Sequence, residues 1–286
     1  MDRISIATAA GPVSALAAGH GPPLHFAHAT GMNAALYGRL LAPLAAEFAI
    51  TASDARGHGQ TGLDRDPAAL TSWDEFADDL NRLLDALAAP GRWLLAGHSM
   101  GAAVSLLAAA ARPDRVAGLV LIDPAMLPFD VAAAVRGGAE IPNPMADQAA
   151  RRRPGFASRD EAWRAYHGRG VFRSWPDADL AAYLDGGLVE SGDGVVLACT
   201  PAYEAATFRA VSPRIELALA AIACPFILLA GEQGSTVRDA ELAAFAAHPA
   251  CLAATRLPGT SHFLPLEAPD AVRAAIGHVS SSSRAR

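Results

Sequence analysis

A serine flanked by glycines is the group in this chain best suited to nucleophilic chemistry. Ser99 is the central residue of the segment Gly97-His98-Ser99-Met100-Gly101. Glycine two residues to either side permits a sharp, strained turn in which larger side chains would clash. The strain exposes the hydroxyl, and the N–H of Met100 then points toward a developing oxyanion. The pattern predicts a nucleophilic serine, and its alternative is a glycine-bounded turn with an idle serine.

An activated serine needs a base, and that base needs a carboxylate to orient it. Among the nine histidines, His262 follows the last predicted strand and precedes the last predicted helix, at the same sheet edge as Ser99. His28 and His58 belong to that edge too, where we expect them to hold loop backbone. His98 points away from the nucleophile by its position in the turn. His262 is therefore the predicted base.

The hydrophobic pattern around these residues is that of strands alternating with helices. Residues 93–96 form an apolar run before the serine turn, an alanine-rich helix pattern follows it, and residues 116–122 form another apolar run. Strands that are apolar on both faces are typical of a parallel sheet covered by helices on both sides. The alternation resumes near the C-terminus with a strand, a helix, a strand and a helix, predicted over residues 225–230, 237–247, 252–257 and 269–279.

An irregular segment interrupts this alternation. Residues 125–212 hold six prolines and only short helical pieces. A helical insertion inside a regular sheet is best interpreted as a cap over the carboxyl edge of the sheet. We therefore expect residues 1–124 and 213–286 to form the core and residues 125–212 to form the cap. Residues 280–286 are expected to be a disordered tail.

Five segments, in this order, resemble the α/β-hydrolase superfamily, and specifically its capped, single-domain serine hydrolases of the esterase or lactonase kind. The resemblance implies an α/β-hydrolase fold, with a mostly parallel central sheet, helices on both faces, and a helical cap inserted after the strand that follows the nucleophile helix. It also implies that the backbone N–H groups of Thr30 and Met100 form the oxyanion hole. The matching segments are residues 28–31, 54–59, 97–101, 119–124 and 259–263.

The carboxylate of the predicted site departs from the usual pattern of the superfamily. Residues 231–235 read Gly-Glu-Gln-Gly-Ser, with a glycine where the resemblance implies an aspartate. Asp123, which directly follows an apolar strand, is the predicted acid, because some capped hydrolases carry their acid at that strand end. Glu232 is the alternative acid, and Asp239 is a further candidate.

The identity of the nucleophile excludes some classes of hydrolase. Serine at position 99 argues against haloalkane dehalogenases and epoxide hydrolases, whose nucleophile is a carboxylate. The predicted reaction is hydrolysis of a small apolar carboxylic ester or lactone, with Ser99, His262 and Asp123 as catalytic residues. Carbon–carbon bond cleavage of a diketone by the same residues, and ligand binding without turnover, are the alternatives. The sequence contains no metal-binding or nucleotide-binding motif, so we expect no cofactor.

The predicted cap supplies a hint about the substrate. Nine of the 18 aromatic residues fall within residues 125–212. Aromatic side chains near a catalytic edge favour an apolar, ring-containing substrate. The alternative is that they form the core of the cap itself. The candidate pocket residues are His28, Trp163, Tyr166, Trp175 and Phe263.

Composition limits the partners and the compartment. A net charge of −6 and a pI near 5.8 argue against nucleic acid or an anionic membrane as a partner. The three cysteines lack metal-like spacing and do not suggest a disulfide framework. An acid at position 2 and the lack of a long apolar stretch argue against a signal peptide or a membrane span. We expect a soluble, cytoplasmic protein, and the sequence predicts no particular oligomeric state.

Overall fold

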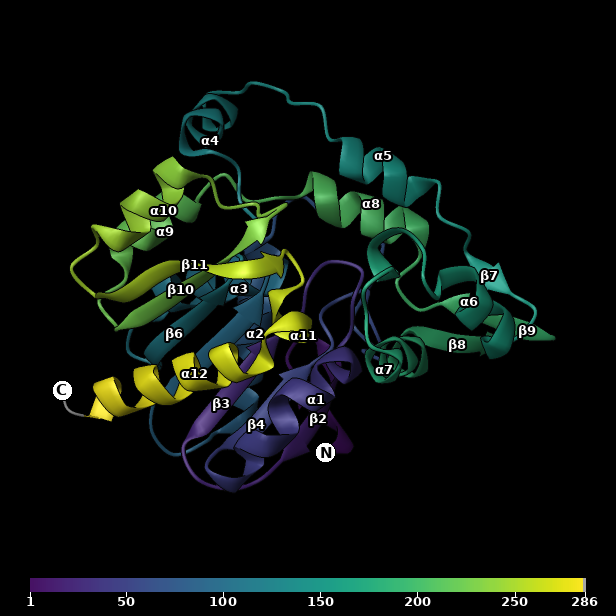
Figure 1. The fold of residues 1–286 in the computed structure, drawn as a ribbon, viewed down its shortest axis with the longest axis horizontal. Helices are drawn as coiled ribbons and strands as arrows, with labels where there is room; N and C mark the ends of the chain where they lie inside the picture. The colour runs from purple at the N-terminus through teal and green to yellow at the C-terminus, as the bar shows by residue number, and fades with distance from the viewer. Residues whose placement is uncertain (285–286) are drawn as a thin grey trace.

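Eight strands form the central sheet of the computed structural model, which describes residues 1–284 (Figure 1). In chain order these strands are β1 (Asp2–Thr8), β2 (Gly11–Ala18), β3 (Pro23–Ala27), β4 (Ala49–Ser53), β5 (Trp93–His98), β6 (Val116–Ile122), β10 (Phe226–Gln233) and β11 (Cys251–Ser261). Across the sheet the order is β1-β2-β4-β3-β5-β6-β10-β11. The pairings β1–β2 and β2–β4 are antiparallel, and every pairing from β4 to β11 is parallel. The expected mostly parallel sheet is confirmed.

Helices cover both faces of this sheet. The helices of the core are α1 (Gly38–Leu41), α2 (Asp74–Leu87), α3 (Met100–Ala111), α9 (Ile215–Ala221), α10 (Asp239–Ala246), α11 (Leu264–Glu267) and α12 (Pro269–Arg284), with the short 3-10 helices η1 (Ala34–Tyr37) and η2 (Ala42–Ala46). One face carries α2, α3, α9 and α10, and the other carries α1 and α12. Figure 1 shows α12 in yellow across the front of the sheet.

Residues along the central strands alternate between the two helical layers. On β5 and β6, Leu95 and Leu121 pack with the α2 and α3 layer, whereas Leu94 and Val120 pack with the α12 layer. All four side chains are nearly or fully buried. Because both faces of each strand are covered, the strands appear in the sequence as continuous apolar runs instead of alternating ones.

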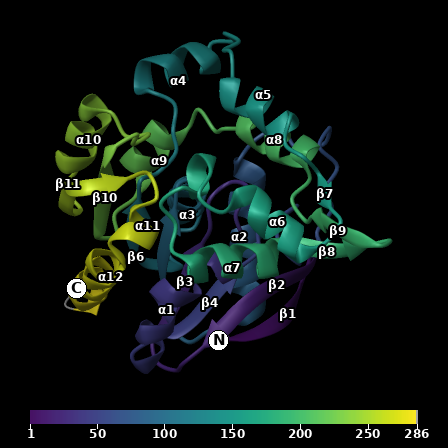
Figure 2. The same ribbon diagram turned by 45° about the vertical axis from the view of Figure 1, so that its right-hand side comes forward.

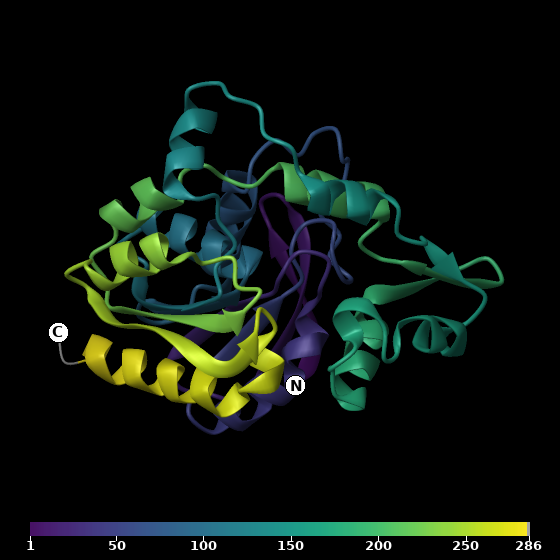
Figure 3. The same ribbon diagram turned by 45° about the horizontal axis from the view of Figure 1, so that its top comes forward.

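The chain between β6 and α9 leaves the sheet and forms its own group of elements. They are α4 (Phe129–Arg136), α5 (Pro144–Ala150), β7 (Gly155–Phe156), α6 (Arg159–Tyr166), η3 (Gly170–Phe172), α7 (Asp177–Gly187), β8 (Leu188–Ser191), β9 (Gly194–Leu197) and α8 (Pro201–Arg209). In Figures 1 and 3 the strands β7–β9, α6 and α7 stand together at the right of the molecule, and in Figure 2 the same group is turned toward the viewer.

This segment is less purely helical than the sequence predicts. The strands β7, β9 and β8 form a three-stranded antiparallel sheet in that order. Each has only two to four residues, too few to produce a recognisable alternation of apolar and polar side chains. Hydrogen bonds from Trp73 Nε1 to the carbonyl of Thr207 (2.7 Å) and from Asn33 Nδ2 to the carbonyl of Tyr183 (2.9 Å) tie the segment to the core.

The expectation of a disordered tail is wrong for the residues that the structure describes. Instead of ending near residue 279, α12 continues to Arg284, while residues 285 and 286 lie outside the described part of the chain. The side chains of Val279 and Ser280 are buried, so packing extends the helix into the serine-rich stretch. Within residues 1–284, no helix has both the length and the apolar character needed to cross a membrane.

One glycine on α3 allows two elements to approach closely. A Cβ on Gly101 would overlap the backbone of Ala27, at the end of β3. We expect Gly101→Ala to lower the free energy of unfolding by several kcal/mol, because backbone atoms must move to accommodate the methyl group. Urea unfolding followed by circular dichroism would measure this loss.

The matched control for this substitution lies on α12. A Cβ on Gly277 would meet nothing within 4 Å, so Gly277→Ala should stabilise the protein by up to about 1 kcal/mol through helix propensity. Equal stabilities for the two variants would contradict the close approach at Gly101.

Candidate active site

The turn between β5 and α3 carries Ser99, which is buried. Ser99 adopts φ 55° and ψ −118°, a conformation that L-residues rarely occupy and that costs on the order of 1–3 kcal/mol. Two contacts hold the turn in this conformation. Gly97 and Gly101 lie so close together that a Cβ on Gly97 would overlap Gly101. The N–H of Ser99 donates to the carbonyl of Ile122, on β6, at 2.9 Å. The sharp turn that the glycine spacing predicts is therefore present.

His262 lies against the hydroxyl of Ser99. Its Nε2 is 3.0 Å from Ser99 Oγ, although the two residues are 163 positions apart in the chain. His262 directly follows β11 and precedes α11, so it stands at the carboxyl edge of the sheet, where the sequence predicts it. This geometry allows Ser99 to donate its proton to the imidazole.

The ring of His98 fixes the backbone of His262. His98 Nε2 is 2.7 Å from the carbonyl oxygen of His262, which can only accept a hydrogen bond, so Nε2 carries the proton. His98 Nδ1 therefore accepts from the hydroxyl of Tyr37, at 2.8 Å. The same hydroxyl accepts from the N–H of Ala29, at 3.3 Å. His98 and Tyr37 thus connect the loop of His262 with the loop that follows β3.

Asp123 is the carboxylate that the structure brings to His262. Its Oδ1 lies 3.2 Å from His262 Nδ1, a hydrogen-bonding distance, although the N–H is not well aimed at the oxygen. Catalytic hydrogen bonds are often poorly aligned before a substrate binds. Glu232 is exposed and accepts from the N–H of Gly259 at 2.9 Å, and Asp239 is exposed and pairs with Arg256. Neither alternative acid contacts His262.

The Asp123 carboxylate is fully buried yet favours its ionised form. Burial raises the pKa of this carboxyl, but contact with His262 and hydrogen bonds from the amides of Gly231 and Thr236 outweigh burial, and the pKa lies below its usual value. Asp123 also has a positive φ of 42°, which aspartate tolerates better than most residues. Its backbone is thus held in one unusual conformation at the strand end.

The loop after β3 is held by two buried histidines. His58 Nε2 accepts from the N–H of Gly31 at 3.0 Å, and its Nδ1 donates to the carbonyl of Arg56 at 2.8 Å. His28 Nε2 accepts from the N–H of Ala55 at 2.9 Å, and its Nδ1 donates to the carbonyl of Ala29 at 2.8 Å. Both side chains hold loop backbone, and neither contacts Ser99.

The residues proposed for the oxyanion hole flank this arrangement. Met100 begins α3 directly after Ser99, and Thr30 precedes Gly31 in the loop after β3. Within residues 1–284, neither backbone N–H donates to a protein acceptor. Two such N–H groups beside a nucleophile could receive the oxygen of a tetrahedral intermediate.

The predicted pocket residues do not all lie together. Phe263 packs edge-on against His262 (ring centroids 5.6 Å apart), and Trp175 packs edge-on against Phe263 (5.3 Å). Tyr166 is one layer further out, against Phe172. Trp163 instead stacks on His167 at 5.3 Å. Of the five candidates, therefore, Phe263 contacts His262 and Trp175 contacts Phe263, while His28 is buried and holds the loop after β3.

A buried ion pair that the sequence analysis missed lies beside the same loop. Arg152 pairs with Glu204 at 2.5 Å and also donates to the hydroxyls of Tyr166 (3.1 Å) and Tyr183 (3.0 Å). A Cβ on Gly31 would lie 2.5 Å from Glu204 Oε1, so the carboxylate rests directly on this glycine. Burial raises the pKa of the Glu204 carboxyl, and Arg152 opposes that shift. No spacing in the sequence signals this pair.

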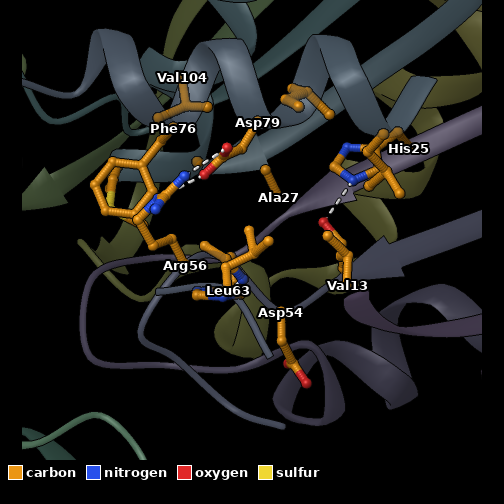
Figure 4. Close-up of a pocket in the computed structure, with 16 residues that line it drawn as sticks. Val13, His25, Ala27, Asp54, Arg56, Leu63, Phe76, Asp79 and Val104 are labelled. Atoms are coloured by element: carbon orange, nitrogen blue, oxygen red, sulfur yellow. Dashed lines mark hydrogen bonds and ion pairs between the residues drawn. The ribbon is translucent and has the colours of Figure 1, made fainter. Parts of the chain in front are cut away.

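A small cavity lies among β3, the chain after β4, α2 and the start of α3. It has a volume of about 40 Å³, and its lining includes His28 and Met100 but neither Ser99 nor His262. Figure 4 shows the ion pair between Arg56 and Asp79 at one end and His25 at the other. This cavity is distinct from the surroundings of the nucleophile. In the described part of the chain, no group of three or more His, Cys, Asp or Glu residues could hold a metal ion.

Comparisons with known proteins agree with the fold described above. A model of the alpha/beta hydrolase family matches residues 17–275. The chain is 39% identical over 105 residues to 2-(acetamidomethylene)succinate hydrolase of Mesorhizobium japonicum, covering 37% of this chain and 36% of the relative. It is 44% identical over 80 residues to lipase LipV of Mycobacterium tuberculosis, covering 28% of this chain and 29% of the relative. The matches thus span about a third of each curated relative.

The similarity in structure extends over the whole chain. The crystal structure of E-2-(acetamidomethylene)succinate hydrolase superimposes with a TM-score of 0.79 and covers 98% of this chain and 99% of its own, at 24% sequence identity. At this level of identity the likeness concerns the fold.

The buried histidines make stability depend on pH. Burial lowers the pKa of His25 from 6.5 to about 3, and that of His58 likewise to about 3. At a pH between about 3 and 6.5, each of these rings carries an extra proton in the unfolded chain but not in the native chain. The free energy of unfolding should therefore fall as the pH falls, by about 1.4 kcal/mol per pH unit for each histidine. Urea unfolding at pH 7, 6 and 5 would measure the slope.

Replacing one histidine isolates its share of that slope. His25→Gln should reduce the slope below pH 6 by about 1.4 kcal/mol per pH unit, whatever its effect at neutral pH. The exposed His278 provides the control, and His278→Gln should leave the slope unchanged. An unchanged slope in His25→Gln would mean that His25 is protonated in the native protein.

Proposed function

Because this chain belongs to the alpha/beta hydrolase family, we propose that it hydrolyses a small apolar carboxylic ester or lactone through an acyl-enzyme on Ser99. His262 acts as the base and Asp123 as the acid that orients it. The observation that carries the proposal is the contact of His262 with both partners, 3.0 Å from Ser99 Oγ and 3.2 Å from Asp123 Oδ1.

The first half of the reaction forms the acyl-enzyme. Ser99 Oγ attacks the carbonyl carbon of the substrate while its proton passes to Nε2 of His262. Asp123 keeps the other ring proton on Nδ1 and stabilises the imidazolium. The carbonyl oxygen becomes an oxyanion that accepts from the N–H groups of Thr30 and Met100. His262 then returns its proton to the leaving oxygen as the carbon–oxygen bond breaks.

The second half regenerates the serine. A water molecule donates a proton to His262 and attacks the acyl carbon. The resulting oxyanion accepts hydrogen bonds from the same two N–H groups. Collapse of this intermediate releases the carboxylic acid while His262 returns the proton to Ser99 Oγ. When the substrate is a lactone, the leaving oxygen and the acid belong to one molecule, so a single hydroxy acid leaves.

Aromatic side chains beside the base support an apolar substrate. Phe263 contacts His262, and Trp175, from the segment between η3 and α7, covers Phe263. We propose that residues 125–212 act as a cap that selects the substrate through such contacts. Apolar and aromatic linings are typical of sites for small molecules. One relative, lipase LipV, is named for ester chemistry, which is consistent with this proposal.

Ser99→Ala should lower the rate of p-nitrophenyl butyrate hydrolysis by several orders of magnitude, because the variant loses the attacking oxygen and keeps the binding surface. The wild-type protein should also react with a fluorophosphonate probe, and Ser99→Ala should not. Melting temperature serves as the control for folding. A wild-type protein that binds a ligand but is not labelled would instead favour binding without turnover.

The acid can be assigned by a pair of isosteric variants. Asp123→Asn should lower the rate of fluorophosphonate labelling by up to about 10⁴, since the amide no longer favours the productive tautomer of His262. Glu232→Gln is the matched control and should change the rate little, because Glu232 contacts Gly259 at the surface. If Glu232→Gln were the crippled variant, the acid would be Glu232.

A further inference from the structure

We propose that Ser235 and Thr236 are positioning residues, whose hydroxyls hold the Asp123 carboxylate in place for His262. The proposal rests on the catalytic role assigned to Asp123 above. Both residues lie in the loop between β10 and α10, and neither contacts Ser99 or His262. They would therefore act on the reaction only through the carboxylate.

Hydrogen bonds from this loop and from the end of β10 together reach both oxygens of Asp123. The N–H of Gly231 donates to Oδ2 at 2.8 Å. Three donors reach Oδ1, namely the N–H of Thr236 at 3.0 Å, its hydroxyl at 2.9 Å, and the hydroxyl of Ser235 at 3.1 Å. Because each oxygen has its own donors, rotation of the carboxylate about the Cβ–Cγ bond would break hydrogen bonds at both Oδ1 and Oδ2.

The hydroxyl of Ser235 is itself oriented. Its oxygen accepts from the N–H of Val237 at 3.0 Å, so its own proton is available for Asp123. The hydroxyl of Thr236 has a second acceptor in the carbonyl of Pro124, at 3.0 Å, which keeps the side chain over the strand end in either orientation. The two hydroxyls thus complete the surroundings of a carboxylate with no exposed surface.

The crowding at Oδ1 also defines an opposite possibility. Four donors, including His262 Nδ1 at 3.2 Å, surround an oxygen that has two lone pairs. If the hydroxyls competed with His262 for this oxygen, removing one would strengthen the contact between Asp123 and the imidazole. If they position the carboxylate, removing one would weaken it. The two cases predict shifts of opposite sign.

The experiment measures the second-order rate of fluorophosphonate labelling between pH 5 and 9. Thr236→Val removes the hydroxyl at nearly constant volume, and Thr236→Ser restores it. Ser235→Ala provides a second, independent loss of a donor. Thr260→Val is the matched control, because Thr260 is buried on β11 and donates to the carbonyl of Leu257 instead of to Asp123. Melting temperatures are recorded for all variants.

Thr236→Val should lower the labelling rate about tenfold, the effect of losing one hydrogen bond to a charged group. The acid limb of its pH profile should move to lower pH, because a less well-held carboxylate stabilises the imidazolium less. Thr236→Ser should recover most of the rate, and Ser235→Ala should show a smaller loss with the same direction of shift. Thr260→Val should match the wild type.

Other outcomes overturn the proposal in distinguishable ways. An unchanged or faster rate in Thr236→Val, or an acid limb at higher pH, would show that the hydroxyls do not position Asp123. Failure of Thr236→Ser to recover the rate would have the same meaning. Should Thr236→Val fail to fold, the same criteria apply to Ser235→Ala. If the wild-type protein were not labelled at all, the proposed function itself would fall, and the positioning role with it.

Discussion

The close backbone contact between the start of α3 and the end of β3 fixes the geometry on which the site depends. At Gly101 the helix touches the backbone of Ala27 and His28, with no room for a side chain. This contact places Ser99, two residues earlier in the chain, near the loop that begins at His28. Met100, at the start of α3, and Thr30, in the loop after β3, thus lie on the two elements that this contact brings together. The close packing of Gly101 on β3 thus fixes how the serine turn lies relative to the loop after β3.

Polar contacts then bring the remaining loops to this fixed point. His98 and Tyr37 link the backbone of His262 to the N–H of Ala29, and His58 holds Gly31. Each of these side chains is buried, and each imidazole has partners for both nitrogens, so desolvation is compensated by hydrogen bonds. Burial lowers the pKa of His98 and His58, which keeps these rings neutral, whereas the side chain of His262 remains partly exposed.

The sequence predicts the parts of the molecule that depend on local pattern. The parallel core follows from apolar runs of strand length, and Ser99, His262 and Asp123 are found because each stands at or just after a strand end. The pair of Arg152 and Glu204, 52 residues apart, leaves no such signal, because tertiary packing alone selects which charged side chains meet. The contact of Tyr37 with His98 likewise depends on tertiary packing. So does the orientation of Trp163, whose ring stacks on His167, directly after its own helix.

The location of Asp123 on a strand end changes what the loop between β10 and α10 has to supply. A loop that carries a carboxylate must keep one residue type at one position. Here the loop and the end of β10 provide donors. Two of them, the N–H of Gly231 on β10 and the N–H of Thr236 in the loop, belong to the backbone, which any residue except proline offers. These two bonds therefore require no particular side chain, whereas the bonds from Ser235 and Thr236 to the same carboxylate require a hydroxyl. A family search that requires an aspartate in this loop would overlook hydrolases built in this way.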